Sequence, residues 1–218
     1  MFIGHFAIGL AARKVAKLPS LAMLFIAVQF LDLIWPIFVL LGIEHLSIDP
    51  GNTAITPLNF EFYPYSHSLL MAVLWGLLLA LVYWLFTKNK QGSWLLAGLV
   101  LSHWVLDLIT HRPDLPITPF SEVKLGLGLW NYPSAAIVVE FAIFLLGAYW
   151  YFRAGNPPRK IAYWALIAFL LIVHVVNLTG PPPPSIAAVA WSANLMWIIV
   201  LWAWWVDRKK RAVPEQVT

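Results

Sequence analysis

The 218-residue sequence contains no cysteine and few charged residues, and both shortages narrow what the chain can do. Without cysteine there is no disulfide, no thiolate nucleophile and no thiolate metal ligand, so any metal must be held by imidazole, carboxylate or carboxamide groups. Charged residues make up 11% of the chain and hydrophobic residues 61%, which is far from the composition of a soluble domain. The composition predicts a single integral membrane domain over residues 1–218, with little room for a separate soluble domain.

Apolar runs of about 20 residues, the length that crosses about 30 Å of hydrocarbon, recur along the chain. They lie at 19–43, 67–87, 92–111, 133–152, 160–179 and 185–206. A shorter apolar stretch at 2–16 predicts a half-inserted N-terminal helix, and no internal repeat is visible. The expected fold class is therefore all-α, a polytopic membrane helical bundle of about six transmembrane helices plus the half-inserted helix.

Lysine and arginine fall in short clusters beside the apolar runs. The clustered residues are Arg13, Lys14, Lys17, Lys88, Lys90, Arg153, Arg159, Lys160 and 208–211. If the spans alternate, all of them fall on one side, and the loop 44–66, which has no Lys or Arg, falls on the other. Cytoplasmic loops hold the excess of positive charge, so both termini are expected to be cytoplasmic. The net charge of +4 is then an orientation signal, and no nucleic-acid partner is expected.

Several ionisable side chains lie inside the apolar runs, where each costs at least about 2.5–3.5 kcal/mol on insertion scales. They are His5, Asp32, His103, Asp107, Glu140 and His174. Counting from the basic clusters at about 1.5 Å per residue places them roughly 17–23 Å deep, in one layer. Scattered structural residues have no reason to share a level, whereas the groups of one buried site do.

Three members of the run 101–111 share one helix face. His103, Asp107 and His111 are spaced i, i+4, i+8, so they stack on one stripe. Two ligands at i, i+4 on a helix are an established way to supply part of a divalent metal site. The alternative is that Asp107 pairs with a histidine or with Arg112 and joins helices. The spacing alone leaves both interpretations open.

The order of four motifs resembles a known family. They are Gly4-His5, Asp32 late in the next apolar run, Ser66-His67-Ser68 at a helix start, and SHWVLDLITH at 102–111. Over roughly residues 1–115 the chain resembles the LexA-regulated, inner-membrane-associated metal-dependent hydrolase family, which is phospholipase-like and zinc-dependent in type. The resemblance implies a bacterial inner-membrane protein with metal ligands at His5, Asp32, His67, His103 and Asp107. The chain departs from the family pattern at 31–34, which holds one aspartate where members often have two, and at 62–64, where members often have His-Arg-Gly.

Other residues receive supporting roles in this hypothesis. Asp107 or His111 could act as the catalytic base. Residues that could support a ligand or contact substrate are Gln29, Ser66, Arg112, Trp130, Asn131 and Glu140. Each also has a purely structural alternative. Gln29 could hydrogen-bond between helices, Glu140 could pair with His174, and Trp130 could anchor the chain at the membrane interface.

The leading functional hypothesis is metal-dependent hydrolysis of a lipid ester or phosphoester, with membrane lipid as partner and substrate and a site open to the extracytoplasmic side. The expected cofactor is a divalent metal, Zn²⁺ first and Mn²⁺ second. A layer of His, Asp and Glu is also typical of ion or proton transporters, and a metal-binding structural protein without turnover is a further alternative. The oligomeric state is left open.

Overall fold

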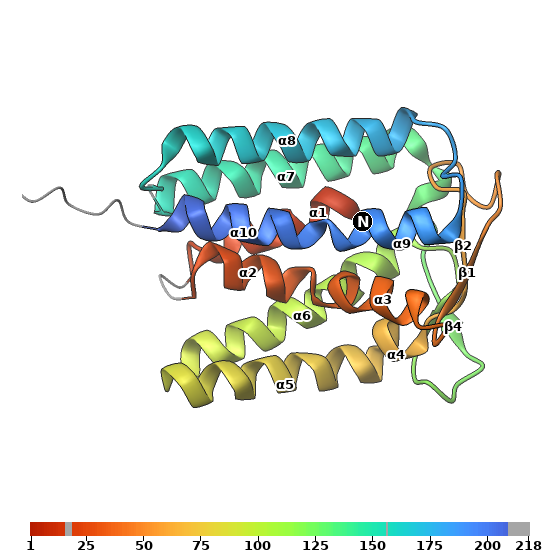
Figure 1. Cartoon of the computed structure of the whole chain (residues 1–218), viewed down its shortest axis with the longest axis horizontal. Coiled ribbons are helices and arrows are strands. Elements are labelled where there is room, and N and C mark those ends of the chain that lie inside the picture. Colours follow the sequence, from red (N-terminus) through yellow and green to blue (C-terminus); the bar gives the residue numbers. More distant parts are fainter. Residues whose placement is uncertain (16–18, 156, 209–218) are drawn as a thin grey trace, which may run out of the picture.

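The computed structural model describes residues 1–15, 19–155 and 157–208, and over these the chain forms a bundle of helices (Figure 1). Within the described residues, five helical stretches are long and apolar enough to cross a membrane. They are α5 (Leu69–Thr87), α6 (Lys90–Thr110), α7 (Pro133–Gly155), α8 (Lys160–Thr179), and α9 (Ile186–Asn194) continued by α10 (Met196–Asp207). The pair α2 (Leu21–Val28) and α3 (Phe30–Leu40) forms a sixth span if the bent pair counts as one. The all-α membrane bundle is confirmed.

The short N-terminal helix α1 (Phe2–Ala12) lies inside the bundle, packed against α7. Its side chains Ile3 and Leu10 are fully buried. The approach to α7 is so close that a Cβ on Gly147 would lie 2.4 Å from the carbonyl oxygen of Ala7, so only glycine permits it. The amino end of α1 is the inner end, and His5 is thereby carried to the middle of the protein.

The first span is interrupted at Gln29, where the backbone leaves the helical conformation with φ −108° and ψ 9°. α2 and α3 meet there at 57°. The interruption has a direct consequence, because the carbonyl of Val28 accepts a hydrogen bond from a histidine side chain instead of continuing the helix. Asp32 follows on the first turn of α3.

The helix ends at the right of Figure 1 are covered by segments expected only as loops. In the range 44–66, strand β1 (His45–Ile48) pairs antiparallel with β2 (Leu58–Phe62), and the one-turn helix α4 (Pro64–His67) follows. In the range 112–132, strand β3 (Leu115–Pro116) pairs with β4 (Lys124–Leu125), and a 3₁₀ turn η1 (Leu129–Asn131) precedes α7. These hairpins satisfy their own backbone groups and bring polar side chains onto the end of the bundle.

Candidate metal centre

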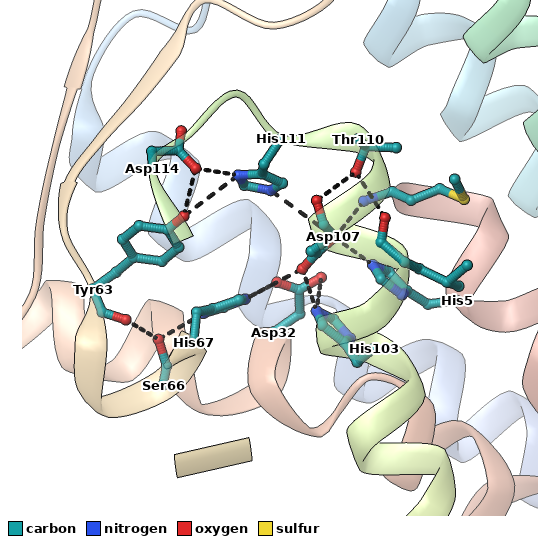
Figure 2. A network of polar contacts seen from close by, with 12 residues as sticks. His5, Asp32, Tyr63, Ser66, His67, His103, Asp107, Thr110, His111 and Asp114 are labelled. Atoms are coloured by element: carbon teal, nitrogen blue, oxygen red, sulfur yellow. Dashed lines mark hydrogen bonds and ion pairs between the residues drawn. The ribbon is translucent and has the colours of Figure 1, made fainter. Parts of the chain in front are cut away.

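The structure brings the five expected ligands together from separate segments (Figure 2). They are His5 on α1, Asp32 on α3, His67 at the end of α4, and His103 and Asp107 on α6. The side chain of Asp32 is 29% exposed, whereas those of His67 and Asp107 are only 5% and 3% exposed. Segments far apart in the sequence thus meet in one largely buried cluster. Of the six residues of the expected layer, the two groups of three contain His5, Asp32, His103 and Asp107 but not Glu140 or His174, and they add His67.

Nitrogen and oxygen atoms of these residues face one another at short range. Asp107 Oδ2 lies 3.0 Å from His103 Nε2, and Asp107 Oδ1 lies 3.1 Å from His5 Nε2. Asp32 Oδ1 lies 3.4 Å from His67 Nε2. Donor atoms about 2.1 Å from one tetrahedral zinc lie about 3.4 Å apart, so these separations suit ligands of a shared ion.

Two groups of three residues offer the donor set of a metal, and His103 belongs to both. One group is His5, His103 and Asp107, and the other is Asp32, His67 and His103. Within each group, one ligand atom per residue lies within 4.8 Å of the others. The rings of His5 and His103 stack in parallel, 3.6 Å apart.

The hydrogen bonds of His103 indicate whether its free ring nitrogen could bind a cation. Its Nδ1 is 2.7 Å from the Val28 carbonyl oxygen, which can only accept, so Nδ1 carries the proton and donates it. Its Nε2 has no hydrogen-bond partner among the described residues, although a carboxylate oxygen of Asp107 lies 3.0 Å away. A lone pair facing a carboxylate is unfavourable unless a cation or a proton lies between them. The residues present therefore fit a divalent metal, and the carbonyl orients the histidine as ligand histidines are usually oriented.

His111 lies at the edge of the cluster and belongs to neither group of three. Its Nδ1 is 3.0 Å from Asp114 Oδ1, and its Nε2 is 3.9 Å from Asp107 Oδ1. The hydroxyl of Tyr63 donates to the same Asp114 oxygen at 2.8 Å, and the ring of Trp130 packs on the imidazole at 4.4 Å. Burial, and then the charge of Asp114, raise the pKa of Tyr63 well above its usual value, so its hydroxyl remains a donor.

Trp130 reaches His111 because of a glycine-rich turn in the sequence GLGLW. A Cβ on Gly126 would lie 2.0 Å from the carbonyl oxygen of Arg112, and Gly128 has a φ of +73°. The amide of Gly128 donates to the His111 carbonyl at 2.7 Å, which ties the turn to the end of α6. Trp130 thus packs on the site.

The remaining expected residues divide into those near the site and those away from it. Ser66 contacts His67, with its Oγ 2.7 Å from Nδ1. Arg112 lies beyond the cluster, with its guanidinium donating to Asn59 at 2.5 Å and lying 3.6 Å from Asp114. Gln29 is buried at the helix interruption, and its side-chain carboxamide has no hydrogen-bond partner among the described residues.

Two expectations of contact fail in the described structure. Glu140 is outside both groups of three, and its buried Oε2 has no hydrogen-bond partner among the described residues. It does not pair with His174 in the described residues, because that imidazole packs between the rings of Phe2 and Phe141. Glu140 shares the expected depth of the site but is buried on α7, the helix that packs against α1.

Asn131 is exposed at the end of η1, and the structure gives it no contact with the cluster within the described residues. His45 is exposed in β1, as expected of a residue outside the layer.

Sequence reasoning did not select four other groups at the site. Asp114 and Tyr63 hold His111, and Glu44 accepts hydrogen bonds from Ser66. The α-amino group of Met1 lies 2.7 Å from Asp107 Oδ1. The i, i+3 spacing of His111 and Asp114 was a usable local signal. No local signal in the sequence indicated that Glu44 would lie at the site, because its position depends on how the 44–66 segment folds back.

Comparison with known protein families shows which family the chain belongs to. The family described as YdjM inner membrane protein matches residues 1–180, which include every residue of the cluster. The chain belongs to the YdjM inner membrane protein family. Membership establishes the inner membrane as the location and agrees with the resemblance noted in the sequence, while activity is a separate question. Comparisons with curated proteins and with solved structures gave no match.

Proposed function

We propose that this protein is a membrane-embedded, metal-dependent hydrolase of a lipid ester or phosphoester. One observation carries the proposal: the Nε2 atoms of four histidines gather around Asp32 and Asp107. The histidines are His5, His67, His103 and His111. So many ionisable groups are costly inside an apolar bundle, and structural pairing alone would need far fewer.

The metal would be held by His5, His103 and Asp107, and the group of Asp32, His67 and His103 offers further ligands. Imidazole nitrogens with carboxylate oxygens suit Zn²⁺, and Mn²⁺ is the second choice. Bound there, the ion supplies Lewis acidity toward the scissile bond and toward water.

His111 is the proposed proton carrier. Because its Nδ1 donates to Asp114, its Nε2 is left with a lone pair on the side of Asp107. That atom can take a proton from the attacking water and return it to the leaving oxygen. Asp114 and Tyr63 keep the imidazole in this tautomer, in the way a carboxylate orients a catalytic histidine elsewhere.

Substrate access is proposed at the side of Asp32, the most exposed of the expected ligands. The side chain of Arg112 is 39% exposed beyond Asp114 and suits the anionic headgroup of a membrane lipid. The basic residues Lys88, Arg153 and Arg159 lie at helix ends remote from the hairpins. If that end is cytoplasmic, as its charge predicts, the site opens to the extracytoplasmic side.

A proton or ion transporter is the second candidate. It is favoured by a series of contacting titratable side chains that runs from Asp107 through His111 and Asp114 to Tyr63. This series of side chains leads toward the end of the bundle that the two hairpins cover. Between the cluster and the basic end, the side chains of Leu24, Leu96 and Val100 are fully buried. A hydrolase needs access from one surface, whereas a transporter needs paths to both, so this arrangement favours the hydrolase.

The decisive experiment incubates the purified protein with Zn²⁺ or Mn²⁺ and phospholipids labelled in the headgroup or acyl chain. Release of headgroup, diacylglycerol or fatty acid that a chelator abolishes is the expected result. Stoichiometric metal without turnover on any lipid ester, together with metal-dependent ion flux in liposomes, would establish the transporter instead. Metal with neither turnover nor flux would leave a metal-binding protein.

A further inference from the structure

A buried carboxylate that the proposed chemistry does not use lies next to the site. Glu44 follows α3 and is 1% exposed. Its Oε1 accepts from the backbone amide of Ser66 at 2.8 Å, and its Oε2 accepts from the hydroxyl of Ser66 at 2.7 Å. Both oxygens are thus engaged by one residue, the neighbour of His67. Burial raises the pKa of Glu44, and these hydrogen bonds oppose the rise because they stabilise the charged form.

The hydroxyl of Ser66 connects Glu44 to His67. Its Oγ lies 2.7 Å from His67 Nδ1, and a hydroxyl has a single proton to donate. Two groups that can only accept lie within reach of it, the Glu44 carboxylate at 2.7 Å and the Tyr63 carbonyl oxygen at 3.3 Å. The shorter contact, to the charged group, is the stronger one, so the proton points to Glu44. The oxygen must therefore accept from Nδ1–H, which leaves the Nε2 lone pair of His67 facing Asp32 at 3.4 Å.

The histidines of the site differ in how their tautomer is set. His103 donates to a backbone carbonyl and His111 to a carboxylate, and both of these acceptors are unable to donate. His67 instead contacts a hydroxyl, which can either donate or accept. For this histidine alone of the three, the neighbouring atom does not determine which nitrogen carries the proton, so a further group has to set the direction.

We propose that Glu44, acting through Ser66, holds His67 in the Nδ1–H tautomer and so keeps its Nε2 available to bind a cation. Glu44 and Ser66 are positioning residues in this arrangement. The inference rests on the proposed metal site, but the tautomer of His67 can be measured in metal-free protein.

The test uses the full-length protein with ¹⁵N-labelled histidine, stripped of metal, and reads the two ring nitrogens of His67 by NMR. A His67→Gln spectrum assigns the signals. The wild type should show Nδ1 protonated and Nε2 unprotonated. In Glu44→Gln the amide nitrogen can donate to Ser66 Oγ, whose proton is then released toward Nδ1 at 2.7 Å or the Tyr63 carbonyl at 3.3 Å. The ring proton should therefore move at least partly to Nε2, whereas an unchanged ring would mean that the Tyr63 carbonyl, and not Glu44, sets the direction. Zinc affinity should fall roughly 10–100-fold, the usual cost of losing a partner that orients a ligand.

Glu61→Gln is the matched control. Glu61 accepts from the hydroxyl of Ser47 at 2.6 Å in the neighbouring hairpin, but the pair is exposed and neither residue hydrogen-bonds a histidine. This variant should leave both the tautomer and the zinc affinity unchanged.

Ser66→Ala is the second variant, in case Glu44→Gln does not fold. Without the hydroxyl, nothing fixes the imidazole proton, and a mixture of tautomers is expected. An unchanged Nδ1–H tautomer in either folded variant would overturn the inference. A wild type that binds neither Zn²⁺ nor Mn²⁺ would refute the proposed function, while the metal-free spectra would still decide the tautomer.

Discussion

Asp107 lies one helical turn after His103 on α6, and its Oδ2 is 3.0 Å from Nε2 of that histidine. Its other oxygen, Oδ1, faces His5 of α1 at 3.1 Å and the amino group of Met1, the residue just before that helix, at 2.7 Å. One carboxylate thus joins the local pair on α6 to a helix whose His5 lies 102 residues earlier in the sequence. The predictions that follow depend on this junction.

His103→Ala should abolish stoichiometric metal binding, because it removes the one imidazole that belongs to both ligand groups. The loss of zinc affinity should exceed the roughly 10–100-fold cost of losing an orienting partner. Elemental analysis of the purified variant measures it. His45→Ala is the control, since His45 is exposed in β1, and it should retain the wild-type metal content.

His111→Ala should retain metal and lose turnover by roughly 10²–10⁴-fold, the usual contribution of a proton-transferring side chain. Metal content and lipid hydrolysis are measured on the same preparation. Loss of the metal in this variant would show that His111 is a ligand and would remove it from the role of proton carrier.

Asp114→Asn should also lower turnover with metal retained. The amide can present its nitrogen to His111 Nδ1, which would move the imidazole proton to Nε2 and block proton uptake there. The comparison is with Asp49→Asn, an exposed carboxylate in the turn between β1 and β2. Equal turnover of the Asp114 and Asp49 variants would contradict an orienting role.

Metal binding should weaken in acid. Imidazoles must be unprotonated to bind a metal, so protons compete with the ion and affinity rises with pH. With a reference imidazole pKa of about 6.5, turnover should fall below about pH 6. Zinc titrations between pH 5 and pH 8 measure the effect, and an affinity independent of pH would mean that histidines are not the ligands.

Gly147→Ala should destabilise the protein by about 1–3 kcal/mol, as overpacking does, because its Cβ would lie 2.4 Å from the Ala7 carbonyl oxygen. Displacing α1 also displaces His5, so metal affinity should fall with thermal stability in detergent. Gly98→Ala is the control: a Cβ there meets nothing within 4 Å, and helix propensity favours alanine. Equal melting temperatures for the two variants would contradict the close packing of α1 on α7.

The apolar runs and the pairing of His103 with Asp107 on one helix face were determined by the sequence alone, whereas His111, expected on the same face, lies just past the helix end as its C-cap. Both are local: hydrocarbon thickness sets the length of a span, and the helical repeat places residues four apart on one face. The burial cost of ionisable groups also marked Asp32 as part of a site before any contact was known.

Tertiary structure decided which residues of the common layer actually meet. Depth along the membrane normal is one coordinate, and it follows from counting residues, but position within the plane depends on how helices pack. Glu140 therefore shares the expected depth of Asp107 and yet lies on α7, outside both groups of three. Glu44 reaches the site only because the 44–66 segment folds back over the helix ends, and that long-range contact with Ser66 leaves no periodic pattern in the sequence.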